Sequence, residues 1–582
     1  MPYDQDLIED QASPTFSVPQ PASVTPLAFA VATTLGLSAC GGDPSATSDS
    51  VNSGAMAGPP ASSPASPPAS TISESQAARF LLQASMGVTR EQIQRVQTLG
   101  YSAWLDEQFT IAGNGSRWDW LVKKGMNAST YRNSQAGFDS CAWRKLISSP
   151  DTLRQRITLA LSEILVVSIQ GLVNGGGWKA FAAANYLDLL EANCFGNYRD
   201  ILQKVSTSTT MSLYLTYRGN TKYNPSTGAL PDENYAREVM QLFSIGLIQL
   251  NLDGSAVMNN GIPAETYGLD DITGLARIFT GWDLDLTTSN TSTPDYHRRP
   301  LRLVPTKHEF GSSSFLGKTI PAGLRGEEAL KMSLDILFAH PNVAPFISRQ
   351  LIQRLVTSNP SAGYIKRVAT VFNNNGGGVK GDMKAVIKAI LLDDEARDES
   401  NLSNPQFGKL KEPMLRFCAW ARSFAANSKS DTWLIGDTSD AGSRLGQSPL
   451  RSPTVFNYFR PGYVPPNTSI ANSHLVAPEM QIVNESSVVG YVNFMQSAIN
   501  ASRDVGDLTA DYRGLLSLAD NASALVSELN LLLAANQIGS NSIALITQAI
   551  NSMRSGSDGY RYQRIYAALT LVLASPEFIV LK

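Results

Sequence analysis

The side chains best suited to base catalysis or metal binding are scarce, since the 582-residue sequence holds only four histidines. His308 lies in the polar segment 307–311, and His340 ends an expected helix. A neutral imidazole can accept a proton near neutral pH or bind a transition metal. His340 has a second interpretation, because an imidazole in the last turn of a helix interacts favourably with the helix dipole. We expect His297 and His474 to lie in solvated loops.

Glu238 is the carboxylate with the most suggestive surroundings. It belongs to residues 231–243, where a proline and acidic residues near the start favour helix initiation. On a helical wheel Glu238 lies at the edge of the apolar face, and a half-buried carboxylate needs a partner. It could bind a metal or act as a general base. Alternatively, it could bond an arginine such as Arg277 or Arg354 and join two helices.

Glu238, His308 and His340 together would supply the three protein ligands that a catalytic divalent metal ion needs. They define one functional hypothesis, a metal-dependent, hydrolase-like enzyme. The sequence contains neither a Gly-x-Ser-x-Gly nor a His-Glu-x-x-His motif. The loop 448–461 combines arginines with aromatic residues. It could recognise an anion or a glycan, or its rings could fill the core while its arginines cap helix ends.

Cys40 carries the most informative signal near the start of the sequence. It closes the run Leu37-Ser38-Ala39-Cys40 after an apolar stretch, an arrangement that resembles the lipobox of bacterial lipoproteins. The pattern predicts a signal segment at 1–40, a lipidated Cys40 and a place in the cell envelope, with the outer membrane favoured. The alternative is a disordered leader with a chance cysteine, because the first basic residue is Arg79. The apolar stretch is too short to span a bilayer as a helix.

The other three cysteines are Cys141, Cys194 and Cys418, and none belongs to a Cys-x-x-Cys pair. At most one intrachain disulfide can therefore form among them. Cys141 and Cys194 are the candidate pair, because both lie in the same expected helical block. The alternative is three isolated, buried and reduced thiols.

Composition and periodicity predict a large, mainly α body behind a tether. Residues 41–72 are rich in Ser, Pro and Ala and should be disordered. Folding should begin at Ser73, and residues 73–582 should form a multi-helix body with long loops and at most one small β-hairpin, near 247–258. The formal net charge of −3 argues against a nucleic-acid partner. Helices are expected at 73–84, 89–99, 327–340, 344–356, 364–373, 383–392, 412–425, 521–533, 543–553 and 560–573.

Twelve segments, in order, resemble the bacterial family called domain of unknown function 1800, from about residue 75 to the end. They are 78–84, 100–105, 154–163, 195–200, 231–246, 280–282, 340–342, 350–355, 381–382, 412–413, 452–457 and 575–578. The resemblance implies a secreted bacterial protein of no established activity. It also implies a partner, a secreted protein of the domain of unknown function 1501 family, which is similar to phosphatases and sulfatases.

The resemblance bears on the metal hypothesis as well. Many relatives carry Glu and His where this sequence has Gln241 and Phe243, so two ligands of any shared metal site would be missing here. The competing hypothesis is a non-catalytic envelope protein that binds, matures or helps to assemble another secreted protein or a surface polymer.

Overall fold

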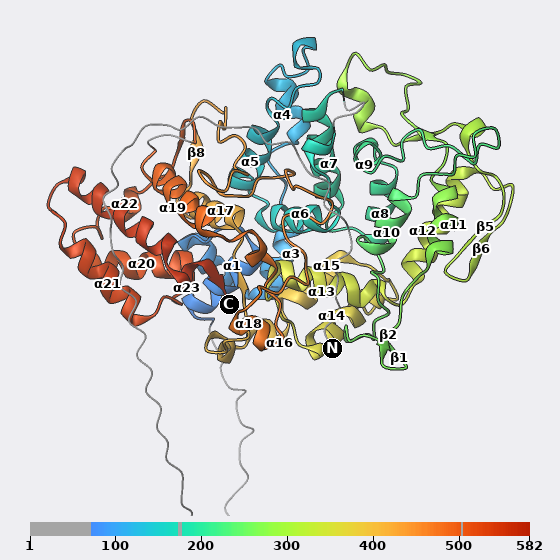
Figure 1. Ribbon diagram of the computed structural model, residues 1–582. Coiled ribbons are helices and arrows are strands. Elements are labelled where there is room, and N and C mark those ends of the chain that lie inside the picture. The colour runs from blue at the N-terminus through green and yellow to red at the C-terminus, as the bar shows by residue number, and fades with distance from the viewer. Residues whose placement is uncertain (1–71, 173–176, 502–504) are drawn as a thin grey trace, which may run out of the picture. The chain divides into compact units, whose positions relative to one another are not determined.

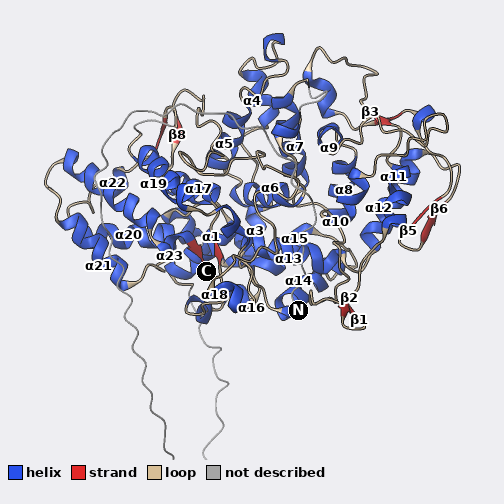
Figure 2. Cartoon of the chain, viewed as in Figure 1, coloured by secondary structure: helices blue, strands red, loops and turns tan. Residues whose placement is uncertain are grey.

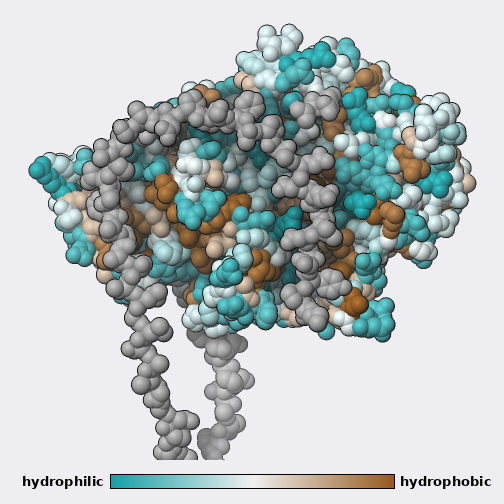
Figure 3. Space-filling view, viewed as in Figure 1, coloured by the Kyte–Doolittle hydropathy of each residue, from teal (hydrophilic) through white to brown (hydrophobic). Residues whose placement is uncertain are grey.

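The computed structural model describes residues 72–172, 177–501 and 505–582. Cys40, the expected signal segment 1–40 and residues 41–71 of the expected tether lie outside these ranges. Among the described residues, no helix has the length and apolar character needed to cross a bilayer. On the face drawn in Figure 3, hydrophobic residues reach the surface in separate patches among polar ones.

Helices dominate the described residues, as Figure 2 shows, and the mainly α prediction is confirmed. The first half contains α1 (Glu74–Ala84), α2 (Arg90–Leu99), α3 (Tyr101–Gln108), α4 (Arg117–Lys123), α5 (Phe138–Ser148), α6 (Thr152–Ile164), α7 (Lys179–Asn193), α8 (Tyr198–Ser206), α9 (Thr209–Tyr214), α10 (Asn234–Gln241) and α11 (Leu269–Ile278). Then follow α12 (Gly326–Ala339), α13 (Val343–Leu355), α14 (Ala362–Asn373), α15 (Met383–Leu391), α16 (Asp394–Arg397) and α17 (Pro413–Ser423). The last are α18 (Ser469–Asn472), α19 (Glu485–Ile499), α20 (Ala522–Ala534), α21 (Ser540–Asn551), α22 (Asp558–Ala574) and α23 (Pro576–Ile579).

The predicted helix signals near the start of the body are present. Ser73 and Gln76 form a capping box at α1, in which each side chain bonds the other's backbone N–H. Thr89 accepts a hydrogen bond from the Gln92 N–H and starts α2. Gly100 ends α2 with a φ of 78°, a left-handed conformation that favours glycine.

The helices that matter for the site pack around α6 and α13. Helix α6 contacts α5, α7 and α13, while α13 also packs on α14 and α15. Figure 1 shows α6 and α13 in the middle of the body and α10 close to them. The buried apolar side chains of these helices belong to one continuous core.

The predicted hairpin forms, and the structure adds further short strand pairs. Leu250 bridges Ala256 across the Asp253–Gly254 turn. The antiparallel pairs among the described residues are β1 (Met258–Asn259) with β2 (Ile262–Pro263), β3 (Trp282–Asp283) with β4 (Arg302–Leu303), β5 (Ser313–Phe315) with β6 (Lys318–Ile320), β7 (Lys409–Leu410) with β10 (Val580–Leu581), and β8 (Asn427–Ser428) with β9 (Leu508–Thr509). Strands of two or three residues are too short to show a period-2 pattern, so sequence could not predict them.

The expected Cys141–Cys194 disulfide is wrong. Cys141, Cys194 and Cys418 are all free and buried. Each thiol of the expected pair instead donates to a carbonyl within its own helix region, Cys141 to Phe138 and Cys194 to Glu191. Burial raises the pKa of Cys194 to about 12, which keeps that thiol protonated and unreactive. The alternative of isolated reduced thiols is therefore the correct one.

Candidate binding pocket

Glu238 is buried on α10, but it does not bond either of the expected arginines. Its exposed fraction is 7%, and its Oε2 has no hydrogen-bond partner. Arg277 pairs with Glu309 at 3.6 Å, and Arg354 pairs with Glu163 at 3.4 Å. Burial raises the pKa of Glu238, and the neighbouring Arg237 only partly offsets it.

The histidines have local structural contacts. His308 is buried, with Nδ1 2.7 Å from the carbonyl oxygen of Thr280. His340 follows α12, and its Nδ1 accepts a hydrogen bond from the Asn342 N–H at 3.1 Å. Burial and the charge of Lys380 lower the pKa of His340. The expectation that His297 is solvated is wrong, because the 3₁₀ turn Pro294–Arg298 packs against α7 and buries it.

The structure does not bring the proposed metal ligands together. Among the described residues, no group of three or more His, Cys, Asp or Glu side chains is arranged to hold a metal ion, and Glu238, His308 and His340 form no such group. Glu238 is on α10, His308 is in the loop before β5, and His340 follows α12. The positions of these three residues in the sequence could not show whether their side chains lie close together in the fold.

A cavity of about 360 Å³ lies instead where α6 ends, between α10 and α13. We call it the α10–α13 pocket. It is lined by Glu163, Ile164, Val166, Gln241, Leu242, Gly246, Leu247, Ile248, Leu250, Phe346, Arg349, Gln350, Gln353, Arg354, Val455, Phe456, Pro461 and Gly462. The walls are mostly apolar, and the polar side chains come chiefly from α13, the composition typical of a small-molecule site.

Segments far apart in the sequence build this pocket. Residue Gln241 comes from the motif run that contains Glu238, one turn further along, and Val455 and Phe456 come from the loop 448–461. Gly246 adopts a φ of 71°, and a Cβ there would lie 2.7 Å from the Phe346 ring. The chain turns tightly at Gly246, so the residues that follow α10 can pack close to Phe346 on α13.

The structure shows where the rings and arginines of the loop 448–461 lie, and its predicted role in anion or glycan recognition stays a prediction. Phe459 is buried beneath the Arg354 guanidinium, 4.7 Å from ring centroid to Cζ. Arg451 bonds the Asp139 carboxylate, at 2.7 Å from Nη2, rather than capping a helix end. Phe456 is partly exposed and lines the pocket. The loop therefore places the Phe459 ring in the core and the Phe456 ring in a pocket wall.

Arg349 is the cation in this pocket that contacts no carboxyl group among the described residues. Within the described residues it has no ion-pair or hydrogen-bond partner, and burial alone lowers its pKa. The next residue, Gln350, is only 8% exposed, and its Nε2 also lacks a partner. Neighbouring Arg354, in contrast, lies 3.4 Å from a Glu163 carboxyl oxygen and stacks on the Phe459 ring. An unpaired guanidinium beside an unpaired amide donor is suited to an anion.

Two buried carboxyl groups, Glu163 and Glu412, meet beneath the pocket. Both oxygens of Glu163 and Oε1 of Glu412 lack a conventional donor, and one proton shared between the two groups satisfies one oxygen of each. Burial, and then the charge of Glu412, raise the pKa of Glu163 well above its ordinary value. The pKa of Glu412 is lowered from its ordinary value. Burial acts to raise it, but the hydrogen bond from Glu163 and the charges of Lys409 and Arg156 outweigh burial. The proton therefore belongs to Glu163.

Further buried charges surround this carboxyl pair. Lys409 Nζ lies 2.8 Å from Glu479 Oε1, with side chains 0% and 1% exposed, and it also donates to the Arg354 carbonyl at 2.8 Å. Arg156 donates to the same carbonyl. The charges of Glu412 and Glu479 also act on the buried Arg156 and Arg416, where they partly offset the lowering of the pKa by burial.

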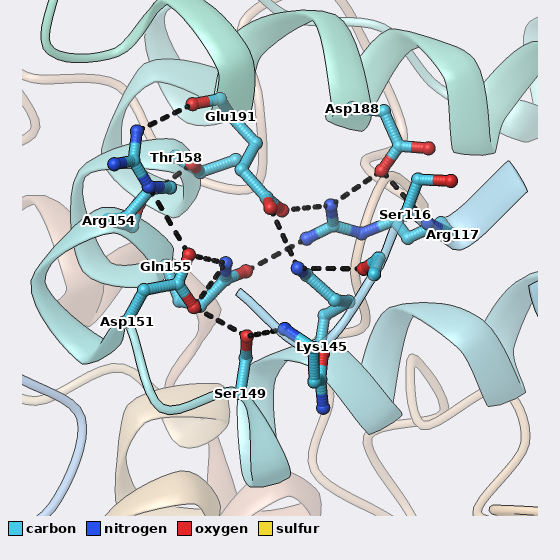
Figure 4. Close-up of polar contacts among 12 residues, drawn as sticks. Ser116, Arg117, Lys145, Ser149, Asp151, Arg154, Gln155, Thr158, Asp188 and Glu191 are labelled. Carbon is cyan, nitrogen blue, oxygen red and sulfur yellow. Dashed lines mark hydrogen bonds and ion pairs between the residues drawn. The ribbon is translucent and has the colours of Figure 1, made fainter. Parts of the chain in front are cut away.

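A second polar cluster, drawn in Figure 4, joins α4, α5, α6 and α7. Arg117 bonds Asp188 at 3.1 Å and Glu191 at 2.6 Å, and Lys145 reaches Glu191 at 2.7 Å. Arg154 lies 3.3 Å from Asp151. Its three cations and three carboxylates balance. This balance favours a structural role for the cluster.

Sequence reasoning found the right segments but missed the residues that shape the pocket. Glu163, Arg349 and Glu412 were not singled out as site residues. Glu163 and Arg349 did carry a signal, because each is a charged residue inside an apolar helical run. Such a residue is buried with the face around it, and a buried charge requires a partner or a ligand.

The comparisons with known proteins agree with the resemblance noted above. The family model described as "Protein of unknown function (DUF1800)" matches residues 79–580. Searches of curated proteins and of solved structures find no match. Because the matched range covers most of its length, the chain belongs to the DUF1800 family.

Proposed function

We propose that this chain is a lipid-anchored protein of the bacterial cell envelope that binds another secreted protein or a surface polymer without catalysing a reaction. The α10–α13 pocket is its binding site. The observation that carries this proposal is Arg349, a half-buried cation that contacts no carboxyl group among the described residues and lies in an apolar-walled cavity. Leaving a charge unpaired in a folded protein costs free energy, which a ligand would recover.

The proposed anchor is Cys40, and the proposed partner is a secreted protein of the domain of unknown function 1501 family. The lipobox-like run before Cys40 supports the anchor. Acyl chains contribute roughly 0.8 kcal/mol per buried CH₂, so a multiply acylated cysteine holds a protein firmly on a membrane. The family resemblance supports the partner.

Replacing Cys40 with Ser should release the protein from membranes. The thiol is the only group in the motif that can accept the diacylglycerol, so the variant should move from the membrane pellet to the soluble fraction when cells are fractionated by sedimentation. Ser45→Ala, in the same Ser-rich segment, is the control and should stay in the pellet. If Cys40→Ser still sediments with membranes, the proposed anchor is wrong.

Filling the pocket should weaken partner binding. Val455→Trp places a large ring at the pocket wall, and we expect it to weaken binding of the secreted partner by roughly tenfold or more, about 1.4 kcal/mol. Binding is measured by calorimetry between the purified partner and the full chain in lipid nanodiscs. Val488→Trp is the matched control, since Val488 is 53% exposed on α19 and does not line the pocket. Equal affinities for the wild type and Val455→Trp would contradict the proposed site.

A further inference from the structure

We propose that the α10–α13 pocket recognises a carboxylate at the end of an apolar segment, with Arg349 as the residue that binds the carboxylate. This inference rests on the proposed function and names the chemical class that the site accepts. The two parts of the ligand correspond to two parts of the pocket. The apolar segment contacts the hydrophobic walls, and the carboxylate reaches the cation on α13.

The charge pattern requires an anion. Arg349 has no partner among the described residues, and no carboxylate contributes to its pKa, which burial alone lowers. A neutral or cationic ligand would leave this charge uncompensated.

The donors fit a carboxylate better than a phosphate dianion. A guanidinium presents two parallel N–H groups, a fork that matches the two oxygens of a carboxylate. Gln350, nine-tenths buried on the same helix, adds an Nε2 donor that has no partner. Among the lining side chains, Arg349 and the Gln350 amide have no partner, whereas Arg354 is stacked on Phe459 and lies 3.4 Å from Glu163. A doubly charged group is favoured by a cluster of free cations.

The apolar walls of the pocket determine the chemistry of the rest of the ligand, the segment that carries the carboxylate. The apolar walls are formed by Leu247, Ile248, Leu250, Phe346, Val455 and Phe456. A cavity of about 360 Å³ is at the small end of the range for ligand pockets. It therefore accommodates a short apolar segment, which could be the tail of a free fatty acid or the last side chains of a polypeptide.

Two pairs of probes test this inference and separate those sources. The first pair is octanoate and octanamide. The second is a tetrapeptide ending in Val-Leu with a free carboxylate and the same peptide with a C-terminal amide. Each is titrated by calorimetry into the full chain in lipid nanodiscs, with empty nanodiscs as the blank. Binding of octanoate identifies a free carboxylic acid as a source, and binding of the acidic peptide identifies a polypeptide end.

Arg349→Gln should weaken binding of the carboxylate probe by roughly 10- to 100-fold and leave the weaker binding of the matched amide unchanged. Folding should be retained, since Arg349 makes no ion pair, and thermal unfolding checks this. Arg349→Lys keeps the charge without the fork and should give an intermediate affinity. Arg302→Gln, at an exposed arginine on β4 outside the lining, is the control and should bind like the wild type.

Two results would overturn the inference. One is equal affinity of the wild type for carboxylates and amides, and the other is an unchanged carboxylate affinity in Arg349→Gln. If either occurs while Val455→Trp still weakens partner binding, the assigned ligand chemistry fails and the proposed function stands. If Val455→Trp has no effect on the partner, the proposed function itself fails.

Discussion

Replacing Lys409 with Met is expected to lower the free energy of unfolding by about 3–5 kcal/mol. Lys409 and Glu479 are both fully buried, and no other ion pair is available to Glu479 among the described residues. Its Oε2 already lacks a hydrogen-bond partner. The substitution would therefore leave the buried Glu479 carboxylate without its ion-pair partner. Guanidinium unfolding followed by circular dichroism gives the free energy.

A double-mutant cycle distinguishes loss of the charge pair from loss of packing. Glu479→Met alone should also destabilise, whereas Lys409→Met/Glu479→Met together should cost less than the sum of the two single changes, because no charge remains unpaired. Lys331→Met is the surface control. Its pair with Asp335 has the same 2.8 Å separation but is largely exposed, so the loss should stay below about 1 kcal/mol. A loss of stability below about 1 kcal/mol for Lys409→Met would mean that the buried Lys409–Glu479 pair does not stabilise the fold.

Glu163→Gln should make the protein more stable at neutral pH. Glu163 is the protonated member of the carboxyl pair, and glutamine can donate to Glu412 as the acid does. In the unfolded chain Glu163 ionises above about pH 4.3, while the folded state keeps its proton to higher pH because burial raises the pKa. The folded state therefore binds more protons in that window, and wild-type stability falls as pH rises, by about 1.4 kcal/mol per unit.

The variant removes this pH dependence. Its advantage over the wild type should be near zero at pH 4 and should grow until Glu163 ionises in the folded wild type. Guanidinium unfolding at pH 4, 5, 6 and 7 measures the difference. Glu412→Gln, in contrast, should destabilise the protein at pH 7. The pKa of Glu412 is lowered in the folded state, so its ionised form stabilises the fold at that pH. Parallel pH profiles for Glu163→Gln and the wild type would mean that Glu163 does not hold the proton.

Local sequence signals predicted the helices well and the site poorly, for different physical reasons. The capping box at Ser73 and the glycine stop at Gly100 act within a few residues, so their pattern suffices. Gln241, Arg349 and Val455 line the pocket together although they come from distant segments. Their spacing in the sequence does not show that they lie close together in the fold. Glu238 is buried, but Gln241, one turn further along α10, lines the pocket instead.

The remaining errors came from tertiary packing. His297 sits in a short 3₁₀ turn that resembles an exposed loop in sequence, and only its packing on α7 buries it. Cys141 and Cys194 share a helical block, yet each thiol bonds a carbonyl within its own helix region. Charged residues inside apolar runs, such as Glu163, were the signal available for the site.

The pairing of β7 with β10 has a consequence for how the protein is made. It joins Leu410 to Val580, and the Arg79 guanidinium on α1 donates to the carbonyl of Lys582. During translation, α1 emerges some five hundred residues before this partner exists. Helix α1 must therefore wait for residues 580–582 to be synthesised before these contacts can form.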